Sequence, residues 1–351
     1  DFKPPKEVKT ALEEVYDKGY GKYGPAKGIT ELRKVLAAQV NQEGRKVSEE
    51  NIMICPGARF GVYLAITTLL NPGDEIIVIE PAWPAYKDGA LNAGIKVRTI
   101  KTTLETKWEP SDEEIYNTIN ENTKMIVLNY PNNPTGTIMS RQILESISEI
   151  AMEHNLWILS DEIYSQLYFN KTFPPSIFSI PGMAERTILM DGFSKAYAMT
   201  GWRLGFGIFP DTMIEHVCSI MLNDHSCLPE FVQDAGTAAL QGPQACVDMF
   251  RKKLKVRKDL VVNAINVIPR ISCFNPEGAL YVMIDISQLG GISSQQFAER
   301  LLLEGVSLLP GTMLSEHGES QIRLAYTANQ TNLSTAMNRL NAAIEQIDNL
   351  T

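Results

Sequence analysis

Residues 125–164 read MIVLNYPNNPTGTIMSRQILESISEIAMEHNLWILSDEIY, and this stretch decides the fold. It opens with the apolar run Met125–Asn129 and contains a second one, Leu156–Ser160, near its end. Both runs show little alternation of apolar and polar residues, which is typical of strands covered on both faces. The residues between them include a helical stretch, Arg141–His154. A strand, a helix and a second strand in this order predict a parallel βαβ unit.

Further apolar runs extend this pattern on both sides, from about residue 50 to about residue 210. Three more runs of large or β-branched residues are Glu75–Ile79, Thr187–Met190 and Leu204–Phe209. Because helical stretches separate several of these runs, the sequence predicts an α/β fold with a large domain. We expect its mostly parallel central sheet to be sandwiched by helices.

A different pattern begins at about residue 230. A long helical stretch breaks at Gly242-Pro243, and a closing helix is expected at Asn332–Ile347. Strand-like segments lie between these helices, at Leu280–Asp285, Val306–Pro310 and Gln321–Tyr326. This order predicts a smaller α+β domain.

The composition restricts the possible classes of function. The chain has 351 residues and a formal net charge of −9, which argues against nucleic acid or an anionic membrane as a partner. Its 5 cysteines are scattered and form no CxxC pair, so neither a disulfide framework nor a zinc site is expected. No apolar run approaches the roughly 18 residues of a membrane span, and no secretion signal opens the chain. We therefore expect a cytoplasmic protein.

Chemically distinctive side chains follow the predicted strands of the large domain. In open α/β sheets, ligands bind beyond the carboxyl ends of the strands. The residues expected at that edge are Trp83, Asn133, Asp161, Tyr164 and Lys195. A lysine can form a Schiff base, a carboxylate can pair with a pyridinium nitrogen, and an aromatic ring can stack on a flat ring. These are the groups needed to hold pyridoxal 5′-phosphate (PLP).

Three motifs in the chain resemble those of the class I and II aminotransferases of PLP fold type I. The similarity is to the subgroup that includes prokaryotic aspartate aminotransferases. The motifs are Asn132-Asn133-Pro134-Thr135-Gly136, Asp161-Glu162-Ile163-Tyr164, and the segment from Ser194-Lys195 to Gly201-Trp202-Arg203. Each alone has an ordinary reading, such as a turn, a helix cap or a surface charge. Their joint order and spacing, over essentially the whole chain, indicates the family.

The resemblance implies a fold and a set of residues that hold the cofactor. We expect a large PLP-binding domain at residues 24–245, and a small domain made of residues 1–23 and 246–351. Lys195 matches the family's Schiff-base lysine, which also moves the proton between the substrate Cα and the cofactor. Asp161 matches the carboxylate that keeps the pyridine nitrogen protonated. Asn133 and Tyr164 match the donors to the phenolate oxygen, and Trp83 matches the stacking ring.

The remaining matched residues concern the cofactor phosphate, the substrate and the partner subunit. The phosphate is expected on backbone N–H groups of Gly57-Ala58-Arg59, where a helix begins, together with Arg203 and Ser194. Arg323 matches the arginine that binds the substrate α-carboxylate. Asn133 and Trp83, named above, are also expected to border the substrate. Tyr23 matches a tyrosine that reaches the phosphate of the other subunit, which implies a homodimer with shared active sites.

The activity implied is transfer of an amino group from an L-amino acid to a 2-oxo acid by a ping-pong mechanism. Aspartate is the favoured donor and 2-oxoglutarate the expected acceptor, with aromatic donors and alanine left open. Some bacterial aspartate enzymes of this subgroup carry a lysine for the distal carboxylate where this chain has Ala58. Arg59 is adjacent to that position.

Two other functions remain open from the sequence. A PLP-dependent carbon–sulfur lyase or related synthase on the same scaffold would also need Lys195 and Arg323. A non-catalytic PLP-binding regulator would bind the cofactor without reacting. The acidic charge disfavours the DNA-binding role of such regulators.

Overall fold

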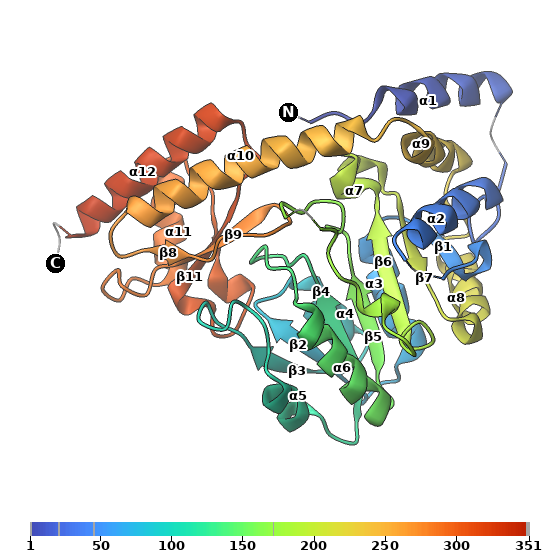
Figure 1. The fold of residues 1–351 in the computed structure, drawn as a ribbon, viewed down its shortest axis with the longest axis horizontal. Helices are drawn as coiled ribbons and strands as arrows, with labels where there is room; N and C mark the ends of the chain where they lie inside the picture. The colour runs from blue at the N-terminus through green and yellow to red at the C-terminus, as the bar shows by residue number, and fades with distance from the viewer. Residues whose placement is uncertain (1, 20–21, 45, 171, 349–351) are drawn as a thin grey trace.

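A central sheet of seven strands organises the larger part of the molecule (Figure 1). The structure is a computed structural model and describes residues 2–19, 22–44, 46–170 and 172–348. The strands are β1 (Ile52–Cys55), β2 (Glu75–Glu80), β3 (Lys96–Lys101), β4 (Thr123–Asn129), β5 (Trp157–Asp161), β6 (Thr187–Gly192) and β7 (Gly205–Ile208). Their order across the sheet is β1-β7-β6-β5-β4-β2-β3.

Most of the pairing in this sheet is parallel. Parallel ladders join β3, β2, β4, β5 and β6, whereas β7 runs antiparallel to both of its neighbours. The prediction of a mostly parallel α/β sheet is therefore confirmed. Asn129 pairs in register with Asp161, so the ends of β4 and β5 lie side by side. The carboxyl ends of the parallel strands meet along one edge, where ligands bind in sheets of this type.

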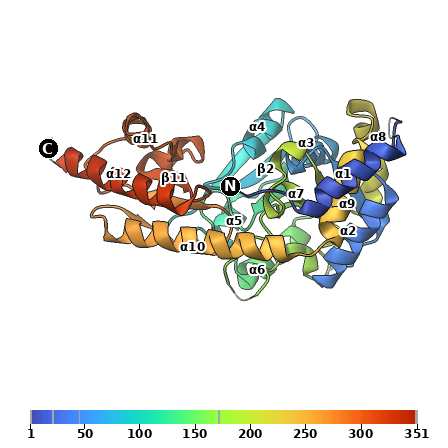
Figure 2. The same ribbon diagram turned by 90° about the horizontal axis from the view of Figure 1, so that it is seen from above.

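Helices cover both faces of the sheet (Figures 1 and 2). One face is covered by α3 (Ala58–Leu69), α4 (Ala85–Asn92) and α8 (Asp211–Asp224). The other is covered by α2 (Thr30–Gln42), α5 (Asp112–Thr118), α6 (Arg141–Glu153) and α9 (Glu230–Gln241). Helix α6 illustrates the cause, since Leu144, Ile147 and Ala151 recur at helical spacing and are all buried. Ser140 caps its first turn by accepting a hydrogen bond from the backbone N–H of Ile143.

The C-terminal part of the chain builds a second sheet with its own core. Its antiparallel strands are β8 (Ser272–Cys273), β9 (Tyr281–Asp285), β10 (Leu309–Pro310) and β11 (Gln321–Ala325), in the order β10-β11-β9-β8. Helices α10 (Ala245–Val267), α11 (Ser294–Leu303) and α12 (Gln330–Asp348) pack with it around one apolar cluster. Because α9 ends before Gly242-Pro243 and α10 begins after it, the predicted helix break is confirmed. Helix α10 runs from the large sheet's helices to the small sheet (Figure 1).

The N-terminal helix α1 (Lys6–Lys18) lies beside α9 in both views of the ribbon (Figures 1 and 2). Val8 is buried in the same apolar cluster as Leu36 of α2 and Ile54 of β1, so the helix packs with the large sheet's layer. The division of the chain into domains at residues 23 and 245 stays a prediction. Short 3₁₀ turns complete the secondary structure, at Glu49–Asn51, Ile177–Ser179, Thr200–Trp202, Gly311–Met313 and Gly318–Ser320.

Four strands, β1, β3, β8 and β10, differ from the sequence-based prediction. Strand β8 has only two residues and forms no apolar run. Strand β1 has only four residues, and β3 is an edge strand whose lysines are exposed, so neither forms a long apolar run. The expected strand Val306–Pro310 is a strand only at Leu309–Pro310. Only Leu309 and Pro310 pair with β11, opposite Arg323 and Ile322. Within the described ranges, none of the helices combines the length and apolar character required to cross a bilayer.

Candidate active site

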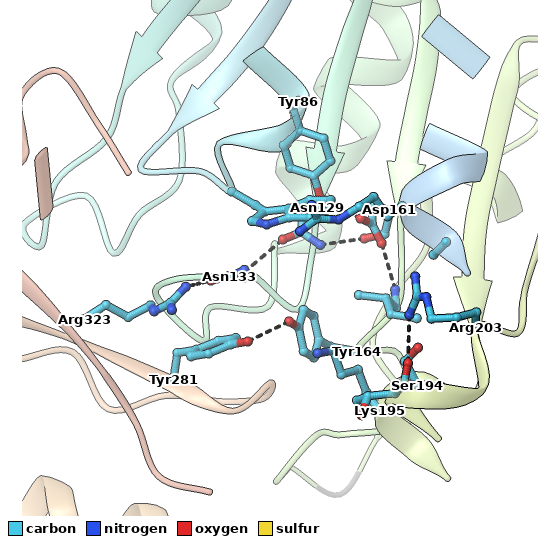
Figure 3. A pocket seen from close by; sticks show the side chains of 15 residues that line it. Tyr86, Asn129, Asn133, Asp161, Tyr164, Ser194, Lys195, Arg203, Tyr281 and Arg323 are labelled. Atoms are coloured by element: carbon cyan, nitrogen blue, oxygen red, sulfur yellow. Dashed lines mark hydrogen bonds between the residues drawn. The ribbon is translucent and has the colours of Figure 1, made fainter. Parts of the chain in front are cut away.

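A cavity of about 280 Å³ opens at the carboxyl edge of the large sheet, where side chains from the small sheet meet it (Figure 3). The predicted site residues that line it are Ala58, Arg59, Trp83, Asn133, Asp161, Tyr164, Ser194, Lys195, Arg203 and Arg323. The other lining residues are Tyr86, Asn129, Ile163, Thr200 and Tyr281. The structure therefore brings together side chains that are spread over most of the chain.

Asp161 ends β5 and points its carboxylate into this cavity. Its Oδ2 accepts a hydrogen bond from Tyr86 Oη at 2.7 Å, and its Oδ1 accepts one from the backbone N–H of Ile163 at 3.1 Å. Burial raises the pKa of Asp161 to about 6, although these two hydrogen bonds and the charge of Lys195 oppose the rise. A cation in the cavity would therefore stabilise the ionised form of this buried carboxylate.

Lys195 lies in the short helix α7 (Phe193–Ala196), directly after β6. Its Nζ is 5.7 Å from the centre of the Tyr164 ring. The Trp83 ring borders the same space and meets the ring of Tyr86 edge-on at 5.3 Å. The guanidinium of Arg59 lies over Trp83, 4.6 Å from the ring centre. An amine and a flat aromatic surface thus face one cavity.

The first turn of α3 and the side chain of Arg203 form a positively charged cradle. Gly57 precedes the helix with a φ of 80°, which favours glycine, and a Cβ at this position would clash with the Arg203 guanidinium. Arg203 Nη1 donates to the carbonyl of Thr200 at 2.8 Å, and Nη2 donates to that of Pro56 at 3.5 Å. Free N–H groups of a helix N-terminus beside a guanidinium make a binding site for a phosphate dianion.

Arg323 enters the cavity from β11 at the opposite side (Figure 3). Its Nη1 donates to Asn133 Oδ1 at 2.9 Å, and its guanidinium lies 4.5 Å from the centre of the Tyr281 ring. Burial lowers the pKa of Arg323, and its buried Nε has no hydrogen-bond partner. None of the ion pairs between described residues includes Arg323. A buried guanidinium without an ion-pair partner is suited to bind the carboxylate of a ligand.

Two predicted residues lie outside the cavity wall. Gly57 is next to it, at the start of α3, whereas the side chain of Tyr23 is 89% exposed. Four polar side chains of the site were missed by the sequence-based reasoning: Tyr86, Asn129, Thr200 and Tyr281. The only signal in the sequence was position, because Asn129 ends a predicted strand and Tyr86 follows Trp83 by three residues. In the described residues, no cluster of His, Cys, Asp or Glu is arranged to hold a metal ion.

Comparison with known proteins identifies the family. The model of the family Aminotransferase class I and II matches residues 1–340. This chain is a class I/II aminotransferase. It is 37% identical to an aspartate aminotransferase of Pyrococcus horikoshii, over 98% of this chain and 88% of that protein. It is 32% identical to aromatic-amino-acid aminotransferase 2 of Thermococcus litoralis, over 99% of this chain and 90% of that protein.

A solved structure supports the same assignment. The aromatic aminotransferase from Pyrococcus horikoshii OT3 superposes with a TM-score of 0.96 at 31% identity, covering 99% of this chain and 94% of the other. The aminotransferase family is PLP-dependent, and the cavity fits that cofactor. The cradle beside Gly57 suits its phosphate, Asp161 suits a protonated ring nitrogen, and the amine of Lys195 suits its aldehyde.

Proposed function

We propose that this aminotransferase moves the amino group of an L-amino acid to 2-oxoglutarate by a ping-pong mechanism, with aspartate as the favoured donor. The observation that carries the proposal is the pair of arginines that line one cavity. Arg323 has an unpartnered Nε, and Arg59, whose guanidinium lies over Trp83, lines the same cavity. One guanidinium would bind the α-carboxylate and the second a distal carboxylate, which matches an amino donor with an acidic side chain.

The cofactor is held, in this proposal, by residues of the large sheet's edge. The phosphate binds the backbone N–H groups at Gly57-Ala58-Arg59 and the side chains of Arg203 and Ser194. Asp161 keeps a proton on the ring nitrogen, and Tyr86 keeps the carboxylate aimed by its 2.7 Å hydrogen bond. The phenolate oxygen receives hydrogen bonds from Tyr164 and from the amide nitrogen of Asn133, named above as the partner of Arg323. Trp83 stacks on the ring.

Lys195 and Arg323 carry the reaction itself. When bound, PLP supplies an aldehyde that links to an amine and a protonated ring that draws electrons from the substrate Cα. Lys195 holds the cofactor at rest, and its free amine takes the proton from Cα and returns it during turnover. Arg323 fixes the substrate carboxylate and so orients the Cα–H bond toward Lys195.

The choice of donor depends on the part of the cavity wall that Arg59 forms. Relatives of this chain carry names that include aspartate and aromatic-amino-acid aminotransferase, so donors differ among similar proteins. Arg59 favours a second carboxylate, whereas an aromatic side chain in the cavity wall, such as Tyr281, offers an apolar surface to an aromatic donor. Aromatic amino acids and alanine are therefore the alternative donors.

The working enzyme is, in this proposal, a cytoplasmic homodimer with shared active sites and without nucleic-acid or membrane partners. The side chain of Tyr23 is 89% exposed in the single chain, which suits a residue that contacts a second copy. There it would reach the phosphate of the partner's cofactor. The net charge of −9 supports the absence of nucleic-acid and anionic-membrane partners.

The test is a half-reaction assay followed by full turnover. Purified protein with PLP should release one equivalent of oxaloacetate per site from L-aspartate and then stop, until 2-oxoglutarate is added. Arg59→Ala should lose activity with aspartate and keep activity with alanine. With a β-thio amino acid in place of aspartate, continuous release of pyruvate, ammonia and a thiol without 2-oxoglutarate would instead indicate a carbon–sulfur lyase. Binding of PLP with no reaction of any amino acid would indicate a regulator.

A further inference from the structure

Tyr281 stands between two groups to which the proposed function gives separate tasks. It begins β9, and its hydroxyl lies 3.1 Å from the hydroxyl of Tyr164. Its ring lies beneath the guanidinium of Arg323, which is 4.5 Å from the ring centre. Figure 3 shows Tyr281 between Tyr164 and Arg323. One side chain thus contacts both the group assigned to the phenolate oxygen and the group assigned to the substrate carboxylate.

The hydroxyl pair has a preferred direction once the cofactor is bound. A tyrosine hydroxyl donates one proton and can accept at its oxygen. If Tyr164 donates its proton to the phenolate oxygen, its own oxygen is free to accept, and Tyr281 is placed to donate to it. A donor that itself accepts a hydrogen bond becomes a stronger donor. The two rings meet edge-on, with an angle of 83° and centres 5.9 Å apart, which fixes the approach of the hydroxyls.

The sheet register explains why the ring of Tyr281 meets Arg323. In the antiparallel pair of β9 and β11, Tyr281 is opposite Ala325, and Met283 is opposite Arg323. Tyr281 and Arg323 are therefore diagonal neighbours, whose side chains project from the same face of the sheet. A guanidinium over an aromatic face is attracted to it, more strongly where water is excluded. The contact restricts the guanidinium to one orientation before a substrate arrives.

We propose that Tyr281 is a positioning residue with two separable tasks. Its hydroxyl orients and strengthens Tyr164 as a hydrogen-bond donor, and its ring holds the guanidinium of Arg323 in place for the substrate carboxylate. The inference rests on the proposed function of the site. It also links the two sheets, because Tyr164 belongs to the large sheet's edge and Tyr281 to the small sheet.

Two substitutions of Tyr281 separate the tasks in the PLP-loaded protein. Tyr281→Phe removes the hydroxyl and keeps the ring, whereas Tyr281→Leu removes both. Tyr116→Phe is the control, since that hydroxyl donates to the carboxylate of Glu153 at 2.9 Å and does not line the cavity. The first measurement is a pH titration of the visible absorption of the lysine-linked cofactor, without substrate. The second is the Kd of 2-aminoisobutyrate, an α-methyl amino acid that has no Cα proton to lose.

Loss of the Tyr281 hydroxyl should change the pKa of the lysine-linked cofactor but not the Kd of 2-aminoisobutyrate. Support of the phenolate lowers the pKa of the lysine-linked cofactor, so loss of that support raises it. Tyr281→Phe should raise this pKa by about 0.2 to 0.5 units, because one hydrogen bond strengthens the next by about 10–30%. Tyr164→Phe removes the direct donor and should raise it by about one to two units. Tyr281→Phe should leave the Kd of 2-aminoisobutyrate within about twofold of the wild type, since a ring remains beneath Arg323.

Loss of the Tyr281 ring should change the Kd of 2-aminoisobutyrate. Tyr281→Leu should weaken 2-aminoisobutyrate binding by about 3- to 30-fold, because the cation–π contact is lost, and Tyr116→Phe should change neither quantity. If Tyr281→Phe leaves this pKa at the wild-type value while Tyr164→Phe raises it, the task given to the Tyr281 hydroxyl is wrong and the task given to its ring still stands. Unchanged binding in Tyr281→Leu overturns the ring's task. If Tyr164→Phe also leaves the pKa unchanged, the proposed role of Tyr164 is wrong, and the inference about the hydroxyl falls with it.

Discussion

Replacing Asp161 with asparagine should stabilise the protein in the absence of PLP, by an amount that depends on pH. The carboxylate is fully enclosed at the end of β5, with the Tyr86 hydroxyl and the Ile163 N–H as its hydrogen-bond donors. Its ionised form is useful when a ring cation is present and unfavourable when the cavity lacks one. The ionised Asp161 carboxylate therefore lowers the stability of the apoenzyme but is expected to strengthen cofactor binding.

The magnitude follows from the pKa of Asp161. Burial raises that pKa from 3.8 to about 6, a difference of about 2 units at about 1.4 kcal/mol each. Because the folded-state pKa lies above the unfolded one, this group's contribution is fully present below about pH 3.8 and is lost as the pH rises through about 6. Near neutral pH, the ionised carboxylate lowers the free energy of unfolding by about 3 kcal/mol.

The assay is urea unfolding of apoenzyme and of apo-Asp161→Asn at two pH values. Asparagine cannot ionise, so the free-energy advantage of the variant should grow by about 1.4 kcal/mol between about pH 5 and about pH 8. The exposed Asp88 provides the control, because Asp88→Asn should show no such growth. With PLP, Asp161→Asn should bind the cofactor more weakly than the wild type. An advantage that stays constant, or shrinks as the pH rises, would refute the reasoning.

Three further substitutions test other parts of the site. Gly57→Ala should weaken PLP binding about tenfold in an equilibrium titration, because its φ of 80° strains alanine and its Cβ would displace the Arg203 guanidinium; unchanged affinity would exclude the cradle as the phosphate site. Arg323→Lys should raise the KM of the amino donor about 30-fold or more, because an ammonium cannot form the bidentate pair, while PLP affinity stays unchanged. Tyr86→Phe removes a hydrogen bond to the Asp161 carboxylate and should raise the pKa of Asp161 by about one to two units. A pH titration of the apoenzyme that follows the carboxyl carbon by NMR measures this pKa. An unchanged carboxyl pKa would contradict the role given to the 2.7 Å hydrogen bond.

The parallel sheet and the residues at its edge could be predicted because both depend on local patterns. Apolar runs without alternation predict strands covered on both faces, and the strand-helix-strand order predicts parallel pairing. Residues that directly follow such strands must gather at one edge, as Asp161 and Lys195 do. The structure places their side chains in one cavity, together with Arg323 of the small sheet.

The side chains that orient these groups could not be predicted in the same way. Tyr86 meets Asp161 across 75 positions of the chain, and Tyr281 meets Tyr164 across 117. No local pattern marks a hydroxyl that will face a carboxylate at such a separation, since the contact depends on how two sheets and a helix pack. The edge strand β3 was missed because its exposed charged residues leave no continuous apolar run, although its backbone pairs in parallel with β2.

The most direct test of the account concerns the residue that holds the cofactor. Reduction of the PLP-loaded protein with borohydride makes any bond between the cofactor and a lysine permanent, and mass spectrometry of its peptides then locates it. The account predicts the added mass on the peptide that contains Lys195, and its loss in Lys195→Ala. Modification of a different lysine, or of none, would contradict the assignment of Lys195.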